Sequence, residues 1–237
     1  MNKIKISAVS YTNTKPFVYG IEHSDIINKI DLSLDIPSDC AAKLIDNQVD
    51  IGLVPVAALL DIPNYQIISD YCIGATGAVN SVFIFSNKPI EEVKTIRLDT
   101  HSRTSNNLAL VLLKNYWKLK PEVVENEADA FVLIGDRTFG KKKDYKYWYD
   151  LAEEWQNFTS LPFAFAVWAA NKPISKEFTD EFNNALKLGL DNRLDVIKDH
   201  SLNGFDLQDY LQNKLDFNLD SKKREAIERF HSYIKAL

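Results

Sequence analysis

The chain has 237 residues, of which 46% are hydrophobic and 26% charged, and its formal net charge is −5. This length suffices for one large α/β domain or for two lobes of about 100 residues each. The net negative charge argues against a nucleic-acid groove, since there is no dominant basic run beyond the triplet Lys141-Lys142-Lys143. No apolar run approaches the roughly 18 residues of a membrane span, and the N-terminal run is too short for a signal peptide. We therefore expect a cytoplasmic protein with neither nucleic acid nor membrane as a partner.

Short apolar strands alternate with helical stretches along the first part of the chain. Thr14 is placed to cap the first helix, with Pro16 in its opening turn, and Ser38 is placed to cap the second. We expect strands at 4–10, 33–36, 51–54, 66–73 and 79–85, with helices after Thr14 and at 39–47 and 56–60. A second section follows, with strands at 95–98, 130–134 and 163–170 and helices at 106–117 and 149–158. The remainder is expected to be helical near 176–189, 191–199, 205–213 and 220–236.

This alternation indicates an α/β fold with a mostly parallel sheet and helices on both faces. Two strands, 79–86 and 163–171, are apolar almost throughout, and each ends in Asn-Lys-Pro. We interpret them as two hinge crossovers between two lobes. Lobe 1 would comprise residues 1–86 and 172–237, lobe 2 would comprise residues 87–171, and a cleft would lie between them.

Metal and nucleotide chemistry have no support in the sequence. Cys40 and Cys72 have neither close spacing nor histidine neighbours, so two reduced, buried thiols are favoured over a disulfide. His23, His200 and His231 lie among polar residues and are expected at the surface. With 8 glycines there is no Gly-rich nucleotide loop. We expect no metal site.

Two polar loops stand between a strand end and a helix start, where α/β proteins present free backbone N–H groups to anions. One runs from Ser10 to Thr14, and the other spans Ser102, Arg103, Thr104 and Ser105. In the second loop, plain helix capping with Arg103 in solvent competes with binding of a carboxylate. In the first, Asn13 could grip a hydroxyl or ether oxygen or serve an Asx-turn. Both loops make a small anionic ligand the leading interpretation.

Ser81 lies inside an apolar strand, where alternation puts it on the face opposite Asn80. Its hydroxyl could face either a cleft or a backbone partner. The aromatic residues of 163–168 (FAFAVW) are core residues first, and some of them could line a pocket for a flat ring.

At these residues the chain resembles the chorismate dehydratase family of the futalosine route to menaquinone. The resemblance covers about residues 4–170 and rests on five separated pieces in order. They are 9–16 (VSYTNTKP), 50–55 (DIGLVP), 98–105 (LD with SRTS), 134–136 (IGD) and 150–155 (DLAEEW) leading to 161–163 (LPF). The C-terminal helices carry little of the signature.

The resemblance implies a two-lobed fold like the type II periplasmic binding proteins and a hydro-lyase reaction on chorismate without a cofactor. It implies catalytic roles for Asn13 and Ser81, with the substrate's own side-chain carboxylate as proton acceptor. Carboxylate binding through free amides is expected at two helix N-termini, one at Ser102–Ser105 and the other at the turn Pro55-Val56-Ala57. The expected substrate-binding residues are Ser10, Tyr11, Pro55, Val56, Ala57, Ser102, Arg103, Thr104, Ser105, Gly135, Asp136 and Phe163.

Two other functions remain open at this point. One is the sister family of the same fold, the dehypoxanthine futalosine cyclase type, which has a histidine where this chain has Gly135 and tends to Thr-Thr where this chain has Ser-Arg-Thr-Ser. The other is a non-catalytic solute-binding or sensor domain, because fold alone does not fix function. The oligomeric state, with a homodimer as one option, is also open.

Overall fold

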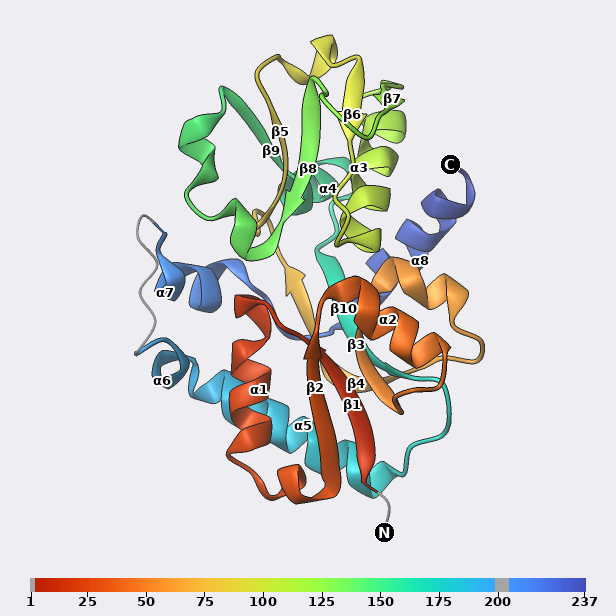
Figure 1. Cartoon of the computed structure of the whole chain (residues 1–237), viewed down its shortest axis with the longest axis vertical. Helices are drawn as coiled ribbons and strands as arrows, with labels where there is room; N and C mark the ends of the chain where they lie inside the picture. Colours follow the sequence, from red (N-terminus) through yellow and green to blue (C-terminus); the bar gives the residue numbers. More distant parts are fainter. Residues whose placement is uncertain (1–2, 199–204) are drawn as a thin grey trace.

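The computed structural model describes residues 3–198 and 205–237 and has two lobes, each built on a five-stranded sheet (Figure 1). The strand order is β2-β1-β3-β10-β4 in lobe 1 and β7-β6-β8-β5-β9 in lobe 2. The strands are β1 Ile4–Val9, β2 Ile30–Asp35, β3 Ile51–Pro55, β4 Gln66–Ala75, β5 Val82–Ser86, β6 Thr95–Arg97, β7 Glu122–Val123, β8 Ala130–Ile134, β9 Tyr147–Asp150 and β10 Phe163–Ala170.

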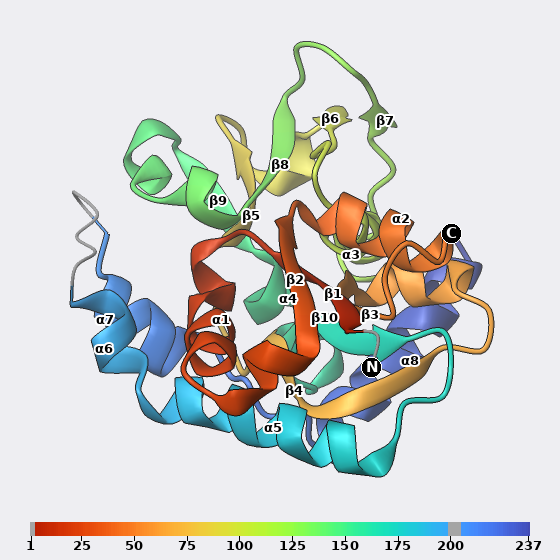
Figure 2. The ribbon, with the colours of Figure 1, turned by 60° about the horizontal axis from the view of Figure 1, so that its bottom comes forward.

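Helices cover both faces of the lobe 1 sheet, as the alternation of elements predicts. In Figure 2, α1 and α5 lie on one side of this sheet, and α2 and α8 lie on the other. The α-helices are α1 Lys15–Glu22, α2 Pro37–Ile45, α3 Arg103–Asn115, α4 Leu151–Thr159, α5 Lys176–Asp191, α6 Arg193–Ile197, α7 Leu207–Asp209 and α8 Ser221–Lys235. The 3-10 helices are Thr12–Thr14, Asp25–Lys29, Val56–Asp61, Ile90–Glu92, Gly135–Thr138 and Lys141–Asp144, and Tyr210–Lys214 is a π-helix.

Each sheet contains one strand that runs against the other four, and these are the two strands interpreted as crossovers. β10 is antiparallel to both of its neighbours in lobe 1. β5 is antiparallel to both of its neighbours in lobe 2. The remaining four pairs among the described strands are parallel, so both sheets are mixed, and the expectation of one mostly parallel sheet needs correction.

The expected lobe boundaries are wrong by one strand at each crossover. β5 lies in the lobe 2 sheet and β10 lies in the lobe 1 sheet, whereas the sequence assigned them the other way round. The chain crosses between lobes just before each strand, at 76–81 and at 160–162. The apolar character marked burial at the hinge but not the lobe to which each strand belongs.

Tight helix packing anchors the first polar loop. A Cβ on Gly20 of α1 would lie 1.9 Å from the Ala185 carbonyl oxygen of α5, and one on Gly189 would lie 1.7 Å from that of Pro16. Only glycine permits this approach of two helix backbones. The loop that enters α1 is therefore held against lobe 1 through α5.

Several expected element boundaries need correction. Ser38 does not cap α2, because the helix begins at Pro37 and the Ser38 hydroxyl turns to the Asp39 carboxylate at 3.5 Å. Thr14 does precede α1, yet its hydroxyl donates to the Asn13 Oδ1 instead of capping the helix. The helix expected at 149–158 is preceded by β9, and His200 lies outside the described residues.

Aromatic packing joins the lobes at the second crossing. The Trp155 ring of α4 lies 5.3 Å from Phe163 at the start of β10 and 5.9 Å from Phe230 of α8. Phe163 is therefore part of the core at the hinge.

Both cysteines are free and buried, as expected, and burial raises the pKa of each thiol to about 12.

Candidate functional site

A narrow cavity of about 60 Å³ lies between the two lobes. Residues from both sheets, from the loop after β1 and from the start of α3 form its wall. Sites for small ligands usually measure roughly 300–1,000 Å³, so the lobes stand close together here. The expected site residues that line this cavity are Tyr11, Asn13, Pro55, Ser81, Ser102, Thr104, Ser105 and Gly135.

The N-terminus of α3 offers free backbone donors beside the cavity. The Ser102 hydroxyl accepts from the Ser105 amide at 3.0 Å, so the capping interpretation holds for Ser102. The amides of Arg103 and Thr104 in the first turn find no acceptor among the described residues. Two unsatisfied N–H groups at the positive end of a helix suit a carboxylate.

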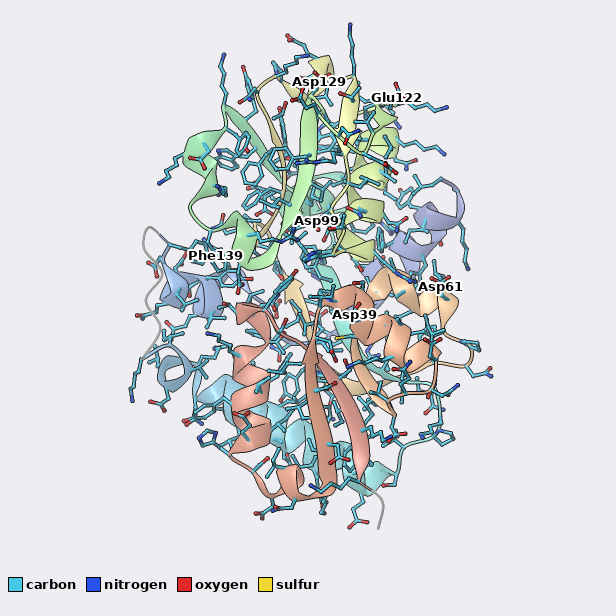
Figure 3. The ribbon with its side chains drawn as sticks, viewed as in Figure 1. Asp39, Asp61, Asp99, Glu122, Asp129 and Phe139 are labelled. Atoms are coloured by element: carbon cyan, nitrogen blue, oxygen red, sulfur yellow. The ribbon has the colours of Figure 1, made fainter. Side chains whose placement is uncertain are left out.

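Arg103 itself points away from the cavity. Its guanidinium donates to the Asp61 carboxylate at 2.9 Å, and both side chains are substantially exposed at the waist of the molecule, where Figure 3 labels Asp61. The structure therefore gives no support to a guanidinium fork on the ligand. Thr104, in contrast, is buried, and its hydroxyl donates to the Phe165 carbonyl at 3.1 Å across the lobes.

Most polar groups of the loop after β1 form hydrogen bonds with other protein groups. The Thr12 amide and hydroxyl both donate to the Asp136 carboxylate of lobe 2, at 3.2 and 2.9 Å. Ser10 is exposed outside the cavity, with its amide on the Asp35 carbonyl. Asp136 thus clamps the two lobes together and is not part of the cavity wall, which this loop lines with Tyr11 and Asn13.

Tyr11 and Gly135 meet face to face across the cleft. Gly135 has φ +62°, and a Cβ on it would lie 2.8 Å from the Tyr11 ring. The Tyr11 hydroxyl lies 3.0 Å from His101 Nδ1, and burial raises the pKa of Tyr11. Asp99 lies behind this contact at the boundary of the lobes (Figure 3) and pairs with Arg137 at 2.7 Å.

The turn at Pro55, Val56 and Ala57 does not present free amides as expected. The Ala57 amide donates to the Thr104 hydroxyl at 3.2 Å. The Val56 carbonyl accepts from His231 Nε2 of α8 at 2.7 Å. His231 is therefore buried rather than exposed, and burial lowers its pKa. Pro55 alone of the three lines the cavity.

The first crossing carries Ser81 into the cavity. Asp150, at the start of α4, fixes this crossing by accepting from the amides of Val79 at 3.2 Å and Asn80 at 2.7 Å. Burial raises the pKa of Asp150 to about 6, while these backbone hydrogen bonds act in the opposite direction. Ser81 follows directly and is 2% exposed.

Local patterns missed two kinds of site residue. Phe165 lines the cavity where Phe163 was expected, because Phe163 packs on Trp155 and Phe230 at the hinge. The other wall residues are apolar and lie on strands, at the first crossing or at the start of α2, and only the tertiary fold brings them together. They are Val9, Pro37, Ile73, Val79, Val82, Ile134 and Ala166.

Within residues 3–198 and 205–237, no group of three or more histidine, cysteine, aspartate or glutamate side chains could hold a metal ion. The helices in the same part of the chain are each too short or too polar to cross a bilayer.

A profile of the menaquinone biosynthesis family matches residues 4–236. The chain belongs to this menaquinone biosynthesis family. It is also similar to a chorismate dehydratase from Campylobacter jejuni subsp. jejuni serotype O:23/36 (strain 81-176), with 29% identity over 143 residues. That match covers 59% of this chain, and the chain spans 58% of the length of this curated relative.

Solved structures share the fold of this family member at low sequence identity. A protein from Archaeoglobus fulgidus superposes with a TM-score of 0.76 at 16% identity, over 99% of this chain and 97% of its own. A Candida albicans protein with the generic periplasmic binding protein fold superposes with a TM-score of 0.69 at 12% identity, over 100% of this chain and 91% of its own. The aliphatic sulphonate binding protein SsuA from Escherichia coli superposes with a TM-score of 0.63 at 12% identity, over 100% of this chain and 92% of its own. The chain thus has the two-lobed fold of the periplasmic binding proteins.

Proposed function

We propose that this member of the menaquinone biosynthesis family is a chorismate dehydratase, a hydro-lyase that converts chorismate to 3-[(1-carboxyvinyl)oxy]benzoate and water. The convergence of Asn13, Ser81 and the α3 N-terminus on one cavity between the lobes carries the proposal. The family match and the Campylobacter jejuni relative support it. The proposal includes a cytoplasmic location, a place on the futalosine route and catalysis without a cofactor.

The chemistry of the cavity suits the substrate. Chorismate is a dianion, and one of its carboxylates could accept hydrogen bonds from the free amides of Arg103 and Thr104 at the start of α3. Its cyclohexadiene ring needs an apolar surface, which Phe165, Val82 and Ile134 provide. Because the cavity measures about 60 Å³, the lobes must move apart to admit this ligand and then close on it.

The reaction breaks two bonds of the substrate. The ring C–H beside the ether loses its proton, the neighbouring C–O bond releases the hydroxyl, and the electron pair completes a benzene ring. No described residue lining the cavity carries a carboxylate, imidazole or amine. We therefore assign proton removal to the substrate's own side-chain carboxylate, which can pass the proton to the departing hydroxide to form water. Aromatisation drives the step, and the protein contributes orientation and hydrogen bonds.

Asn13 and Ser81 would bind the departing hydroxyl and the ether region of the substrate. Each offers a hydrogen-bond donor to an oxygen that gains negative charge as the C–O bond breaks. Charge that develops only in the transition state makes such donors matter more for kcat than for KM.

Gly135 favours the dehydratase over the sister cyclase type. A side chain at this position would collide with the Tyr11 ring at 2.8 Å, and φ +62° disfavours any residue with a Cβ. A histidine there would need a different arrangement of the loop after β1.

The test is to incubate the purified protein with chorismate and follow formation of an aromatic enolpyruvyl ether by ultraviolet absorbance and mass spectrometry. A protein-free sample controls for spontaneous decay of chorismate. The matched variants are Ser81→Ala, expected to be slow, and Ser86→Ala, expected to be as active as the wild type. Ser86 is a buried serine at the far end of β5 whose hydroxyl donates to the Asp129 carbonyl at 3.1 Å.

Three outcomes separate the candidate functions. Formation of the ether supports the dehydratase, and an unchanged chorismate sample refutes it. Tight binding of chorismate without turnover would favour a solute-binding or sensor protein, whose fold this chain shares.

A further inference from the structure

Tyr210 lies directly behind the two residues assigned to the reaction. It begins the π-helix Tyr210–Lys214, which follows α7 in the C-terminal segment, and it is 1% exposed. Turns of this type are rare and often occur at functional sites. The ring is held between Phe139 of lobe 2 at 5.5 Å and Phe205 at 5.4 Å. Figure 3 labels Phe139 at the lobe boundary beside α7.

The hydroxyl of Tyr210 contacts Ser81. It donates to Ser81 Oγ at 2.9 Å. Asn13 lies close enough to this hydroxyl to affect its pKa, and the Asn13 Oδ1 accepts from the Thr14 hydroxyl at 3.2 Å.

The hydrogen bond from Tyr210 leaves the Ser81 proton available for another acceptor. With Tyr210 donating to its oxygen, the Ser81 hydroxyl is left to donate to another group, and Ser81 lines the cavity. The Tyr210 hydroxyl stays protonated, since burial raises its pKa well above the ordinary value. Tyr210 is therefore a hydrogen-bond donor in this chain and does not act as a base.

The ring and the hydroxyl of Tyr210 have separable tasks. The ring lines a surface cavity of about 390 Å³ together with Lys142 and Lys214. Phenylalanine would fill the same space. A buried hydroxyl adds stability only through its partners, and here the partner is the site residue Ser81.

We propose that Tyr210 is a positioning residue for the dehydration, which orients the Ser81 hydroxyl toward the departing oxygen of the substrate. This inference rests on the proposed function. Tyr210 acts through Ser81 and does not itself touch the substrate.

The experiment is a double-mutant cycle on chorismate turnover with Tyr210→Phe, Ser81→Ala and the double variant. Tyr210→Phe is expected to lower kcat by about 10- to 100-fold with little change in KM, because misplacement of a reacting group by a fraction of an ångström acts on the transition state. The double variant is expected to be no slower than Ser81→Ala alone. Tyr149→Phe is the matched control, since it removes another tyrosine hydroxyl, one that accepts from the Ile90 amide at 2.8 Å far from the cavity.

Thermal unfolding of each variant accompanies the kinetics. A small and similar change in Tm for Tyr210→Phe and Tyr149→Phe, with kcat lowered in the first alone, supports the positioning role. Full activity of Tyr210→Phe overturns it, and so does a double variant whose losses multiply. A wild-type protein inert toward chorismate refutes the proposed function instead, and is distinguished by the failure of the wild type itself.

Discussion

The two polar loops, at 10–14 and 102–105, are similar in sequence but differ in the contacts that their side chains make. At 102–105, one hydroxyl caps α3, another bridges to β10, and the first-turn amides stay free beside the cavity. At 10–14, Thr12 is bound to Asp136 of the other lobe and Thr14 to its own neighbour, which leaves Asn13 facing the cavity. A strand-to-helix loop therefore either keeps free amides or clamps the two lobes, according to what lies opposite it.

The largest effect should come from Asn13, the cavity-facing residue of the clamp loop. Asn13→Ala is expected to lower kcat on chorismate by about 100-fold or more, as for loss of a donor to developing negative charge. Asn107→Ala is the control, because the side chain of Asn107 donates to the Arg103 carbonyl on an exposed turn of α3. A rate within twofold of the wild type for Asn13→Ala would remove this loop from the chemistry.

A side chain at Gly135 should prevent the close approach of the two lobes. Gly135→Ala is expected to lower the free energy of unfolding by about 1–3 kcal/mol through backbone strain and to abolish most activity through its collision with Tyr11. Gly140→Ala separates the two causes, because Gly140 has φ +74° with nothing within 4 Å of its Cβ position. Denaturant unfolding and turnover measure both. Equal activity of the two variants would contradict the collision.

Weakening the clamp should act on affinity more than on rate. Asp136→Asn removes the charge from an acceptor of Thr12 hydrogen bonds at 2.9 and 3.2 Å, which destabilises the closed state by about 1–2 kcal/mol. We expect KM for chorismate to rise about 10-fold, in proportion to that loss, with kcat within a few-fold of the wild type. Asp144→Asn, an exposed carboxylate nearby that pairs with Lys141, is expected to leave KM unchanged. A fall in kcat at constant KM would assign Asp136 to the reaction instead.

The smallest effect concerns the turn that supports Thr104, and it depends on pH. The folded-state pKa of His231 lies below its ordinary value of 6.5, because burial disfavours the imidazolium. As the pH falls below about 6.5, the unfolded chain takes up this proton before the folded chain does, so stability is lost on acidification. Tm is therefore expected to decrease as the pH is lowered through this range, and the decrease is expected to be smaller in His231→Phe. Parallel Tm profiles for the two proteins would contradict the assignment.

Local patterns were sufficient to predict most of the strands, the two lobes and the polar part of the cavity wall, but not β7 and β9. The apolar runs at 79–86 and 163–171 marked the hinge because strands buried on both faces lose the polar alternation. The small hydroxyl residues before α3 marked a helix N-terminus for the same reason that they cap one.

The remaining features depend on contacts that no local pattern carries. Asp136 reaches Thr12 across 124 positions, and Tyr210 reaches Ser81 across 129. His231 looked exposed because its sequence neighbours are polar, whereas one face of α8 turns inward onto Val56. Such pairings follow from the way the lobes meet, which in turn depends on the lobe that each hinge strand joins.

The place of β10 in the lobe 1 sheet has a consequence for biosynthesis. β10 is inserted between β3 and β4, yet it is translated after every strand of lobe 2. A nascent chain on the ribosome can complete the sheet of lobe 2 while β3 and β4 still have unpaired edges, which are surfaces prone to aggregation. The interrupted lobe therefore closes last, and chaperones would find their target in this N-terminal half rather than in the lobe embedded within it.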